Sequence, residues 1–238
     1  MRRTQKRAQA ELVTATRQGS HDVVKSLLER GLARVNDVFR ESSDSGDWDI
    51  TVLHLAVERA DLRMVGLLID HGADTEMQGP RGLTPLAVAS ERSDVPMVKL
   101  LLERGAVPEP PNAPIHKTPL VLAVNSANVR VLDALVLGGA RPGGEVLYLC
   151  IAKFASAENN SAFRNMALQL HFAGARMPAD KQLTNLESMA FLRSLTDFRD
   201  KLSARKALQA EALQQYEDET RQISSGLYGW LKSVRRIG

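Results

Sequence analysis

The chain repeats itself with a period of 33 residues. The segment TVLHLAVERADLRMVGLLIDHGAD at 51–74 is followed by TPLAVASERSDVPMVKLLLERGAV at 84–107. The shared positions are Thr51, Leu53, Ala56, Met64, Val65, Gly72 and Ala73 in the first copy, and Thr84, Leu86, Ala89, Met97, Val98, Gly105 and Ala106 in the second. A period of this length predicts a solenoid, in which small units bury their apolar faces against their neighbours.

The repeat extends in both directions. A third copy holds Thr118, Pro119, Leu120, Ala123, Val131, Leu132, Gly139 and Ala140, and an earlier copy holds Leu12, Ala15, Gly19, Val23, Val24, Leu27, Leu28 and Gly31. A fifth copy, with Leu147, Leu149, Ala152, Gly174 and Ala175, fits only with an insertion near residues 155–161. We therefore expect about five units, the last of them degenerate, as terminal repeats often are.

Each unit is predicted to be a pair of short antiparallel helices. Leu53, Ala56 and Val57 give the first helix an apolar stripe, whereas the second helix, around residues 64–69, is apolar on more than one side. Gly72 follows that helix and suits the left-handed backbone that commonly ends helices. One such pair cannot bury both faces alone, so the units must stack.

These motifs resemble the ankyrin-repeat family. Its Thr-Pro-Leu-His-x-Ala signature occurs in pieces at residues 51–56, 84–86 and 118–120, and LLIDHGAD at 67–74 and LLLERGA at 100–106 resemble the second helix of the family. The resemblance implies an all-α solenoid at 10–180, with units at about 10–50, 51–83, 84–117, 118–146 and 147–180. A basic arm (1–9) would precede it and a C-terminal helical extension (181–238) would follow.

Three connections between units are unusual. The one from Gly31 to Thr51 is longer than that from Gly72 to Thr84 and predicts an enlarged hairpin finger at 41–50. Prolines at 108, 110, 111 and 114 predict a stiff finger with few ladder hydrogen bonds. The glycine-rich segment 138–144 is interpreted as a fingertip turn, because no Lys-Ser/Thr follows it as a phosphate loop requires.

From Lys181 onward the composition favours helix. Residues 184–187 form a capping box, and Phe191, Leu195, Phe198 and Leu202 form one apolar seam that we expect to cover the last repeat. The tail is a second candidate partner surface, with an apolar side beside Lys232, Arg235 and Arg236 that consists of Leu227, Trp230, Leu231 and Val234. Folding back on its own domain, docking to a partner and attachment to an anionic membrane surface remain open for it.

Residues typical of catalysis or metal binding do not form a recognisable pattern. The five histidines show no metal-ligand spacing, and Cys150 stands alone, so we expect no metal, no cofactor, no small-molecule substrate and no enzyme. His54 occupies the histidine position of the signature, and the resemblance implies that it braces the turns between units. Cys150 is expected to be a buried small side chain.

Charge and cysteine content bear on partners and compartment. The net charge of +3 comes from Lys and Arg interspersed with Asp and Glu, and the basic clusters at 2–7 and 235–236 are short, which disfavours nucleic acid. One cysteine, the lack of a secretory signal and the lack of an 18-residue apolar run favour an intracellular, cytoplasmic protein. The oligomeric state stays open.

The predicted function is a non-catalytic protein-binding module or adaptor that uses the concave surface and the fingertips. Matching to the contact positions of the family selects Asp47, Trp48, Ile50, Glu58, Arg59, Arg81, Leu83, Glu91, Arg92, Ile115, Lys117 and Asn125. Trp48 is either an anchor for the partner or packed on a neighbouring finger, and the Glu-Arg pairs at 58–59 and 91–92 are either contacts or a solvated ladder. The alternatives are a scaffold assembled through the C-terminal helices and, by the family resemblance, a regulatory or inhibitory subunit or a bacterial-type effector.

Overall fold

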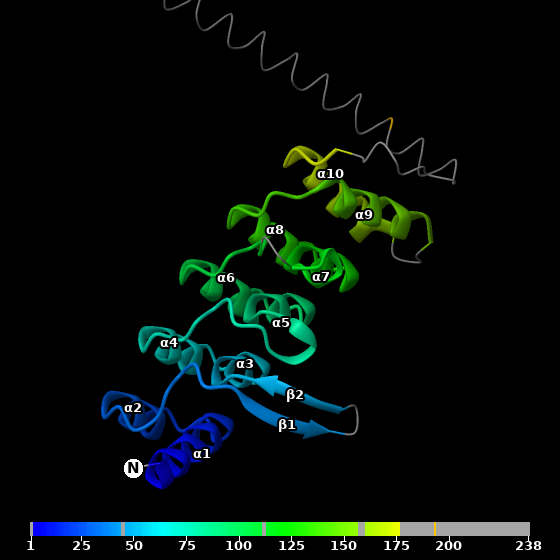
Figure 1. Cartoon of the computed structure of the whole chain (residues 1–238). Helices are drawn as coiled ribbons and strands as arrows, with labels where there is room; N and C mark the ends of the chain where they lie inside the picture. Colours follow the sequence, from blue (N-terminus) through cyan, green and yellow to red (C-terminus); the bar gives the residue numbers. More distant parts are fainter. Residues whose placement is uncertain (1, 44–45, 111–112, 157–159, 177–192, 194–238) are drawn as a thin grey trace, which may run out of the picture. The chain divides into compact units, whose positions relative to one another are not determined.

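The computed structural model describes residues 2–43, 46–110, 113–156, 160–176 and 193 (Figure 1). Contacts divide the chain into two units, residues 1–188 and 189–238. The first unit contains the elements α1 (Arg2–Gln18), α2 (His21–Glu29), β1 (Phe39–Ser43), β2 (Gly46–Ile50), α3 (Val52–Glu58), α4 (Leu62–Asp70), η1 (Pro80–Gly82), α5 (Pro85–Glu91), α6 (Val95–Glu103), η2 (Ile115–Lys117), α7 (Pro119–Asn125), α8 (Val129–Leu137), α9 (Gly144–Ser156) and α10 (Asn160–Phe172).

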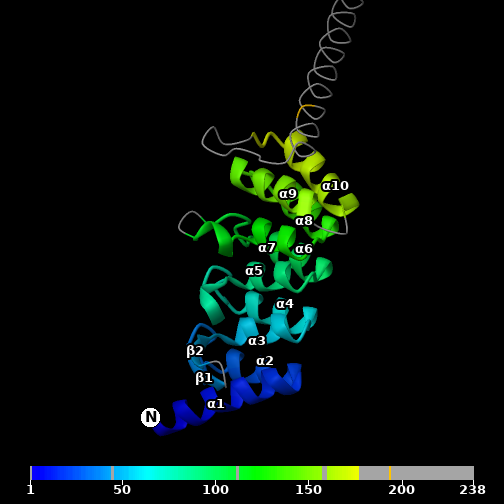
Figure 2. The ribbon, with the colours of Figure 1, turned by 90° about the vertical axis from the view of Figure 1, so that its right-hand side faces the viewer.

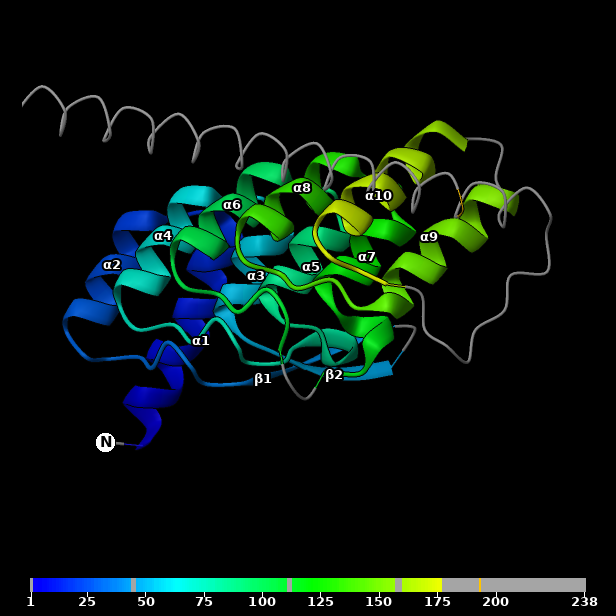
Figure 3. The ribbon, with the colours of Figure 1, turned by 90° about the horizontal axis from the view of Figure 1, so that it is seen from above.

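The helices stack as pairs in two layers. Helices α1, α3, α5, α7 and α9 each contact the next in that series, and α2, α4, α6, α8 and α10 do the same beside them. Figures 2 and 3 show the two series side by side, with the β1–β2 hairpin beyond the odd-numbered helices. The predicted helical solenoid is thus confirmed, and the hairpin is the only sheet among the described residues.

Polar side chains start the helices at repeated positions. The hydroxyls of Thr51 and Thr84 accept the backbone N–H three residues later, at the starts of α3 and α5. Asp61, Asp94 and Asn128 do the same for α4, α6 and α8. An N-cap of this kind stabilises a helix by about 1 kcal/mol. The period therefore recurs in the caps as well as in the apolar positions.

Helices α3, α5 and α7 are the most completely buried helices of the stack. All residues of 52–57, 85–90 and 119–124 are buried, and the leucine at the same position of each helix, Leu53, Leu86 and Leu120, is at most 1% exposed. Only the last residue of each helix, Glu58, Glu91 or Asn125, has an accessible side chain. A partner on this side therefore meets helix ends rather than helix faces.

The loops that follow the even-numbered helices are joined by side chain to backbone hydrogen bonds. Asn36 Oδ1 accepts from Asp74 N at 2.9 Å, Glu76 Oε1 from Val107 N at 2.9 Å, and Glu109 Oε2 from Arg141 N at 3.2 Å. The three N–H groups lie at equivalent repeat positions. Burial raises the pKa of the Glu109 carboxyl, and the N–H of Arg141 partly offsets that shift. Each loop is thus tied to the next.

Two sequence interpretations are wrong, and others fall outside the description. Residues 2–9, predicted as an arm, are the first half of α1. The segment 138–144 is no fingertip: only residues 138–143 separate α8 from α9, against 104–118 between α6 and α7, which leaves no room for a finger. The extra residues of the fifth unit lengthen its first helix, since α9 has 13 residues and α7 has 7. The predicted helix, seam and tail at 181–238 lie outside the described residues, except Arg193.

The structure predicts opposite effects for two glycine-to-alanine substitutions. Gly105 follows α6 with φ of 89° and no atom near its absent Cβ, so Gly105→Ala adds only backbone strain and should lower the free energy of unfolding by about 1 kcal/mol. Gly66 lies inside α4, where a Cβ would meet only Arg104 Nη2 at an ordinary 3.6 Å. Gly66→Ala should raise the free energy of unfolding by about 0.5–1 kcal/mol, because alanine favours a helix interior more than glycine does. Urea denaturation of both variants measures this, and effects of the same sign would contradict the assigned backbone geometry.

Candidate functional site

Three fingers project on the side of the odd-numbered helices. The first is the β1–β2 hairpin, in which Phe39 pairs with Ile50 and Ser43 with Gly46. The second and third are the short turns of η1 and η2. Strand β2 contacts η1, and η2 contacts α7. We call the exposed and partly buried residues at the helix ends and on these turns the finger-side strip; it consists of Glu58, Arg59, Arg81, Glu91, Arg92, Ile115, Lys117 and Asn125.

His54 anchors the second finger from inside. Its Nε2 lies 3.0 Å from Leu83 O and its Nδ1 lies 2.8 Å from Thr51 Oγ1. Since a carbonyl oxygen can only accept, Nε2 carries the proton and Nδ1 accepts from the threonine hydroxyl. A Cβ on Gly79 would come within 2.5 Å of the His54 ring, so the finger needs glycine there. The family position of His54 is thus occupied by an inter-repeat brace.

Burial keeps this imidazole neutral. His54 is 0% exposed, and desolvation lowers its pKa from 6.5 to about 4, although the bond to Leu83 O opposes the shift. The equivalent positions in the next two repeats hold Ala87 and Val121, which cannot make these bonds. The brace is therefore particular to the junction beneath the second finger.

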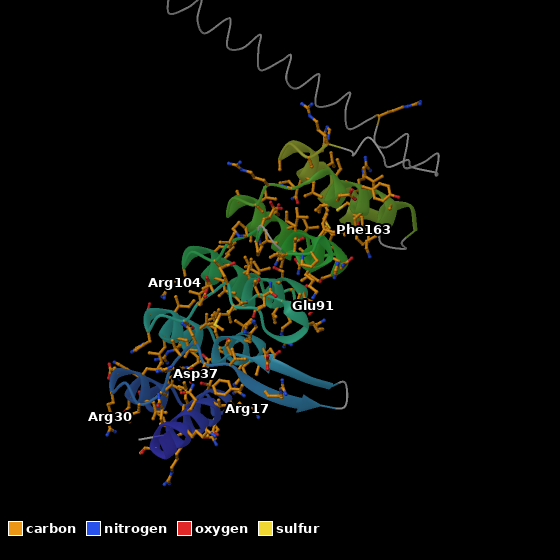
Figure 4. The ribbon with its side chains drawn as sticks, viewed as in Figure 1. Arg17, Arg30, Asp37, Glu91, Arg104 and Phe163 are labelled. Atoms are coloured by element: carbon orange, nitrogen blue, oxygen red, sulfur yellow. The ribbon has the colours of Figure 1, made fainter. Side chains whose placement is uncertain are left out.

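An ion pair closes the same finger from outside. Arg81, with φ of 57° at the tip of the turn, donates from both Nη atoms to the two carboxylate oxygens of Glu91. This bond lowers the pKa of the Glu91 carboxyl against an opposing effect of burial, and it raises the pKa of Arg81, to which the charge of Glu58 also contributes. Figure 4 places Glu91 on the side opposite Arg104. Two predicted contact residues are thus bound to each other.

The second and third fingers touch through Gly82 and Lys117. A Cβ on Gly82 would lie 2.9 Å from Lys117 Nζ, so the lysine amine covers that glycine. Ile115, two residues before the lysine, is 51% exposed. An exposed apolar side chain beside a cation is thus present at the third finger.

The predicted contact residues divide into three groups. Ile50 and Leu83 are 1% and 3% exposed, so the prediction that they meet a partner is wrong: each directly precedes a capping threonine and points into the core. Asp47 and Trp48 lie on β2, and their side chains are outside the described part of the structure. The remaining eight form the finger-side strip, with Glu91 and Lys117 partly buried and the others exposed. For these ten residues, contact with a partner stays a prediction.

Several residues that hold the site together were not singled out in the sequence. Ser126 Oγ donates to Glu91 O at 3.0 Å, which ties the end of α7 to the end of α5. Arg104 Nη1 donates to Asp70 Oδ1 at 2.6 Å, between the ends of α6 and α4. Asp61 caps α4 and accepts from His21 at 3.0 Å. The 33-residue spacing of Asp61 and Asp94 was a signal for the caps, whereas nothing in the pattern identified the pairs that join repeats.

The described residues show no converging chemistry. Burial raises the pKa of the Cys150 thiol to about 12 although Lys153 opposes the shift, and the side chain is 0% exposed, which fits a packing role. Within the described ranges no group of three or more His, Cys, Asp or Glu residues could hold a metal ion. No described helix is both long and apolar enough to cross a membrane.

Comparison with known proteins identifies the repeats. Residues 53–146 match the family model of ankyrin repeats, described as three copies. The fold is similar to the crystal structure of EF0377, an ankyrin repeat protein, with a TM-score of 0.54 and 20% sequence identity over 69% of this chain and 81% of that chain. No curated protein sequence matches. The chain has the ankyrin-repeat fold, and its residues 53–146 are similar to ankyrin repeats, which generally mediate protein–protein interaction and are generally non-catalytic.

The His54 brace predicts a specific dependence of stability on pH. Because the pKa of His54 is lower in the folded chain than its ordinary 6.5, the unfolded chain binds more protons between pH 6.5 and 4. The stability that the neutral His54 brace adds to the folded chain is complete above pH 6.5 and is lost as the pH falls toward 4. The advantage of the wild type over His54→Ala in unfolding free energy should shrink by about 2 kcal/mol between pH 7 and pH 5.

Denaturant titrations at the two pH values measure this difference. His116→Ala is the matched control, because it removes an exposed imidazole from the third finger. Equal pH slopes for wild type and His54→Ala would show that the brace is absent in solution.

Proposed function

We propose that the chain is a non-catalytic binding module or adaptor that holds a protein partner against the finger-side strip. The observation that carries the proposal is the contrast between the body and the end of helices α3 and α5. Residues 52–57 and 85–90 are wholly buried, whereas the Glu-Arg pairs that follow them, at 58–59 and 91–92, are accessible. The buried helix residues are therefore inaccessible to a partner, and the helix ends and fingers are the residues that we propose contact it.

The strip offers contacts of mixed character. Ile115 supplies an exposed apolar side chain, and Arg92 and Asn125 supply an exposed cation and an exposed amide. Arg81 and Glu91 hold each other, so they present a fixed donor and acceptor surface instead of freely moving charges. Such a surface fits a partner with an apolar side chain flanked by acidic groups, since buried apolar anchors and complementary rim charges are typical of interfaces.

Charge reversal on the strip tests this proposal. Arg92→Glu changes an exposed residue at the end of α5, and Lys99→Glu makes the same change in charge on α6, in the other helix layer. We expect proteins captured by the wild type and by Lys99→Glu from a cell extract to be lost or at least tenfold depleted with Arg92→Glu, because a like charge replaces a complementary one.

Quantitative mass spectrometry of the captured proteins gives the comparison. Circular dichroism and urea denaturation of both variants establish that the fold is kept. Identical capture profiles for Arg92→Glu and Lys99→Glu would remove the strip from consideration as the binding surface.

A further inference from the structure

Among the described residues, no strand lies beside the outer edge of the first finger. The sheet in this part of the chain consists of β1 and β2, in the order β1-β2. On its other side β2 contacts η1 of the next finger, so β2 is enclosed between two neighbours. Figures 1 and 2 show β1 at the end of the fingers that lies toward α1. An exposed strand edge of this kind can pair with another extended chain.

The register identifies which backbone groups face outward. Ser43 pairs with Gly46 across a two-residue connection, and in so short a hairpin the closing pair is hydrogen-bonded. Hydrogen-bonded and non-hydrogen-bonded pairs then alternate, so that Glu41 and Phe39 bond to β2. Arg40 and Ser42 belong to the non-hydrogen-bonded pairs, with Asp49 and Asp47. Their N–H and C=O groups therefore point away from β2, and none of the backbone–backbone hydrogen bonds of the described residues joins them to a segment outside the hairpin.

A cavity adjoins the base of this edge. It has a volume of about 310 Å³ and is lined by Gln5, Lys6, Gln9, Arg34 and Asp37. Gln9 forms a two-way pair with the backbone of Arg34, donating to Arg34 O at 2.7 Å and accepting from Arg34 N at 2.9 Å. These two bonds fix the segment against α1, just ahead of β1. The cavity thus lies between α1 and the segment that leads into β1.

The surroundings are basic. Residues 1–40 contain nine Lys and Arg but four Asp and Glu, a net charge of +5, whereas the whole chain carries +3. Lys6 and Arg34 bring two cations to the cavity, against Asp37. The Arg40 side chain is 72% exposed, and its contact with Asp49 is long, at 3.9 Å. Val38, which precedes the edge, is 47% exposed and adds apolar surface.

We propose that the outer edge of β1, together with the cavity at its base, binds an extended acidic segment of a partner protein by strand addition. Arg40 and Ser42 supply two donors and two acceptors to the backbone of the added strand, the pattern by which extended peptides join sheet edges. An apolar side chain of the segment packs on Val38, and acidic side chains pair with Arg40 and with Lys6 and Arg34.

The same features disfavour two other occupants. A second copy of this chain, paired edge to edge, would bring two Arg40 side chains and two basic cavities together, and like charges across strands are destabilising. A nucleic acid would meet the basic groups but has no peptide backbone to satisfy the outward N–H and C=O groups. Binding experiments distinguish both from a peptide.

This edge is distinct from the finger-side strip. Its residues lie on β1, α1 and the segment between α2 and β1, and none of them is in the strip. Arg92→Glu should therefore leave edge binding unchanged, so the two proposals can fail independently.

Synthetic peptides test the backbone pairing. The probes are four seven-residue peptides in which glutamate alternates with valine, leucine, phenylalanine or threonine, titrated by fluorescence anisotropy against the full chain. At least one should bind saturably, and its lysine counterpart should bind at least tenfold more weakly. N-methylation of one alternate set of peptide amides should abolish binding and methylation of the other set should not, because only one edge of an added strand bonds to β1.

Substitutions in the protein, instead of in the peptide, test the same edge. Ser42→Pro removes an outward N–H without removing a β1–β2 bond and should weaken binding at least fivefold, whereas Ser42→Thr keeps the N–H and should bind as the wild type does. Lys6→Glu should weaken binding of the glutamate peptides at least threefold.

The proposal is overturned if no glutamate peptide binds up to about 1 mM, or if the two methylated isomers bind equally. It is also overturned if a single-stranded oligonucleotide binds at least tenfold more tightly than every peptide and is displaced by none. Concentration-dependent dimerisation in sedimentation that Ser42→Pro abolishes would assign the edge to a second copy instead.

Discussion

Burial of each helix pair by its neighbours is the constraint on which the rest of the structure depends. Helices of seven and nine residues are too short to persist alone in water. Here the second helices place Met64, Met97 and Val131 at equivalent positions with 0% exposure. Since helices α3, α5 and α7 are covered along almost their whole length, sequence variation that does not disturb packing there is confined to helix ends and fingers. The stack itself thereby decides which residues are available for recognition.

The repeats pack in the same way, but the polar side chains that join neighbouring repeats differ from one junction to the next. His54 braces one finger through Leu83 O, and the next two repeats replace it with Ala87 and Val121. The finger at 79–83 is thus held by His54 from within and by the Arg81–Glu91 pair from without. This finger contacts β2. The His54–Leu83 hydrogen bond and the Arg81–Glu91 ion pair therefore hold in place the turn on which the first hairpin packs. Within the part of the chain that the structure describes, one edge of the hairpin, on β1, has no strand beside it.

The sequence period predicted the features that packing imposes on every unit. The helix pairs and the glycines after the second helices follow from the requirement that each unit present the same faces. The threonines and aspartates that cap the helices recur at the same period, but their role as caps comes from the structure. The exposure of Ile50 and Leu83 was mispredicted because finger position was given more weight than local pattern. Both precede a helix cap, where an apolar residue commonly packs back onto the first turns of the helix. Lys117 holds the same place before Thr118 and is partly exposed, as a charged residue there should be.

Bonds between distant repeats could not be read from the period. Arg104–Asp70 and Ser126–Glu91 join residues about one repeat apart, yet each occurs at a single junction, so no recurrence marks it. Connection length was the better guide to the fingers. The long segment before Thr51 forms the enlarged hairpin, and the six residues 138–143 form none. Reading residues 138–144 by composition alone led to the wrong assignment, because glycine suits a helix end as well as a fingertip.

The absence of a finger before α9 limits the size of the recognition surface. Among the described residues, fingers precede α3, α5 and α7 only, so the finger-side strip ends with Ile115 and Lys117 on the third finger and Asn125 at the end of α7. Packed helices lie about 8–10 Å apart, so three successive fingers span roughly 20 Å. A surface of that length accommodates one helix or one extended segment of a partner more readily than a whole domain. The outer edge of β1 lies at the opposite end of this row, and the strand addition proposed there is independent of contacts with the finger-side strip.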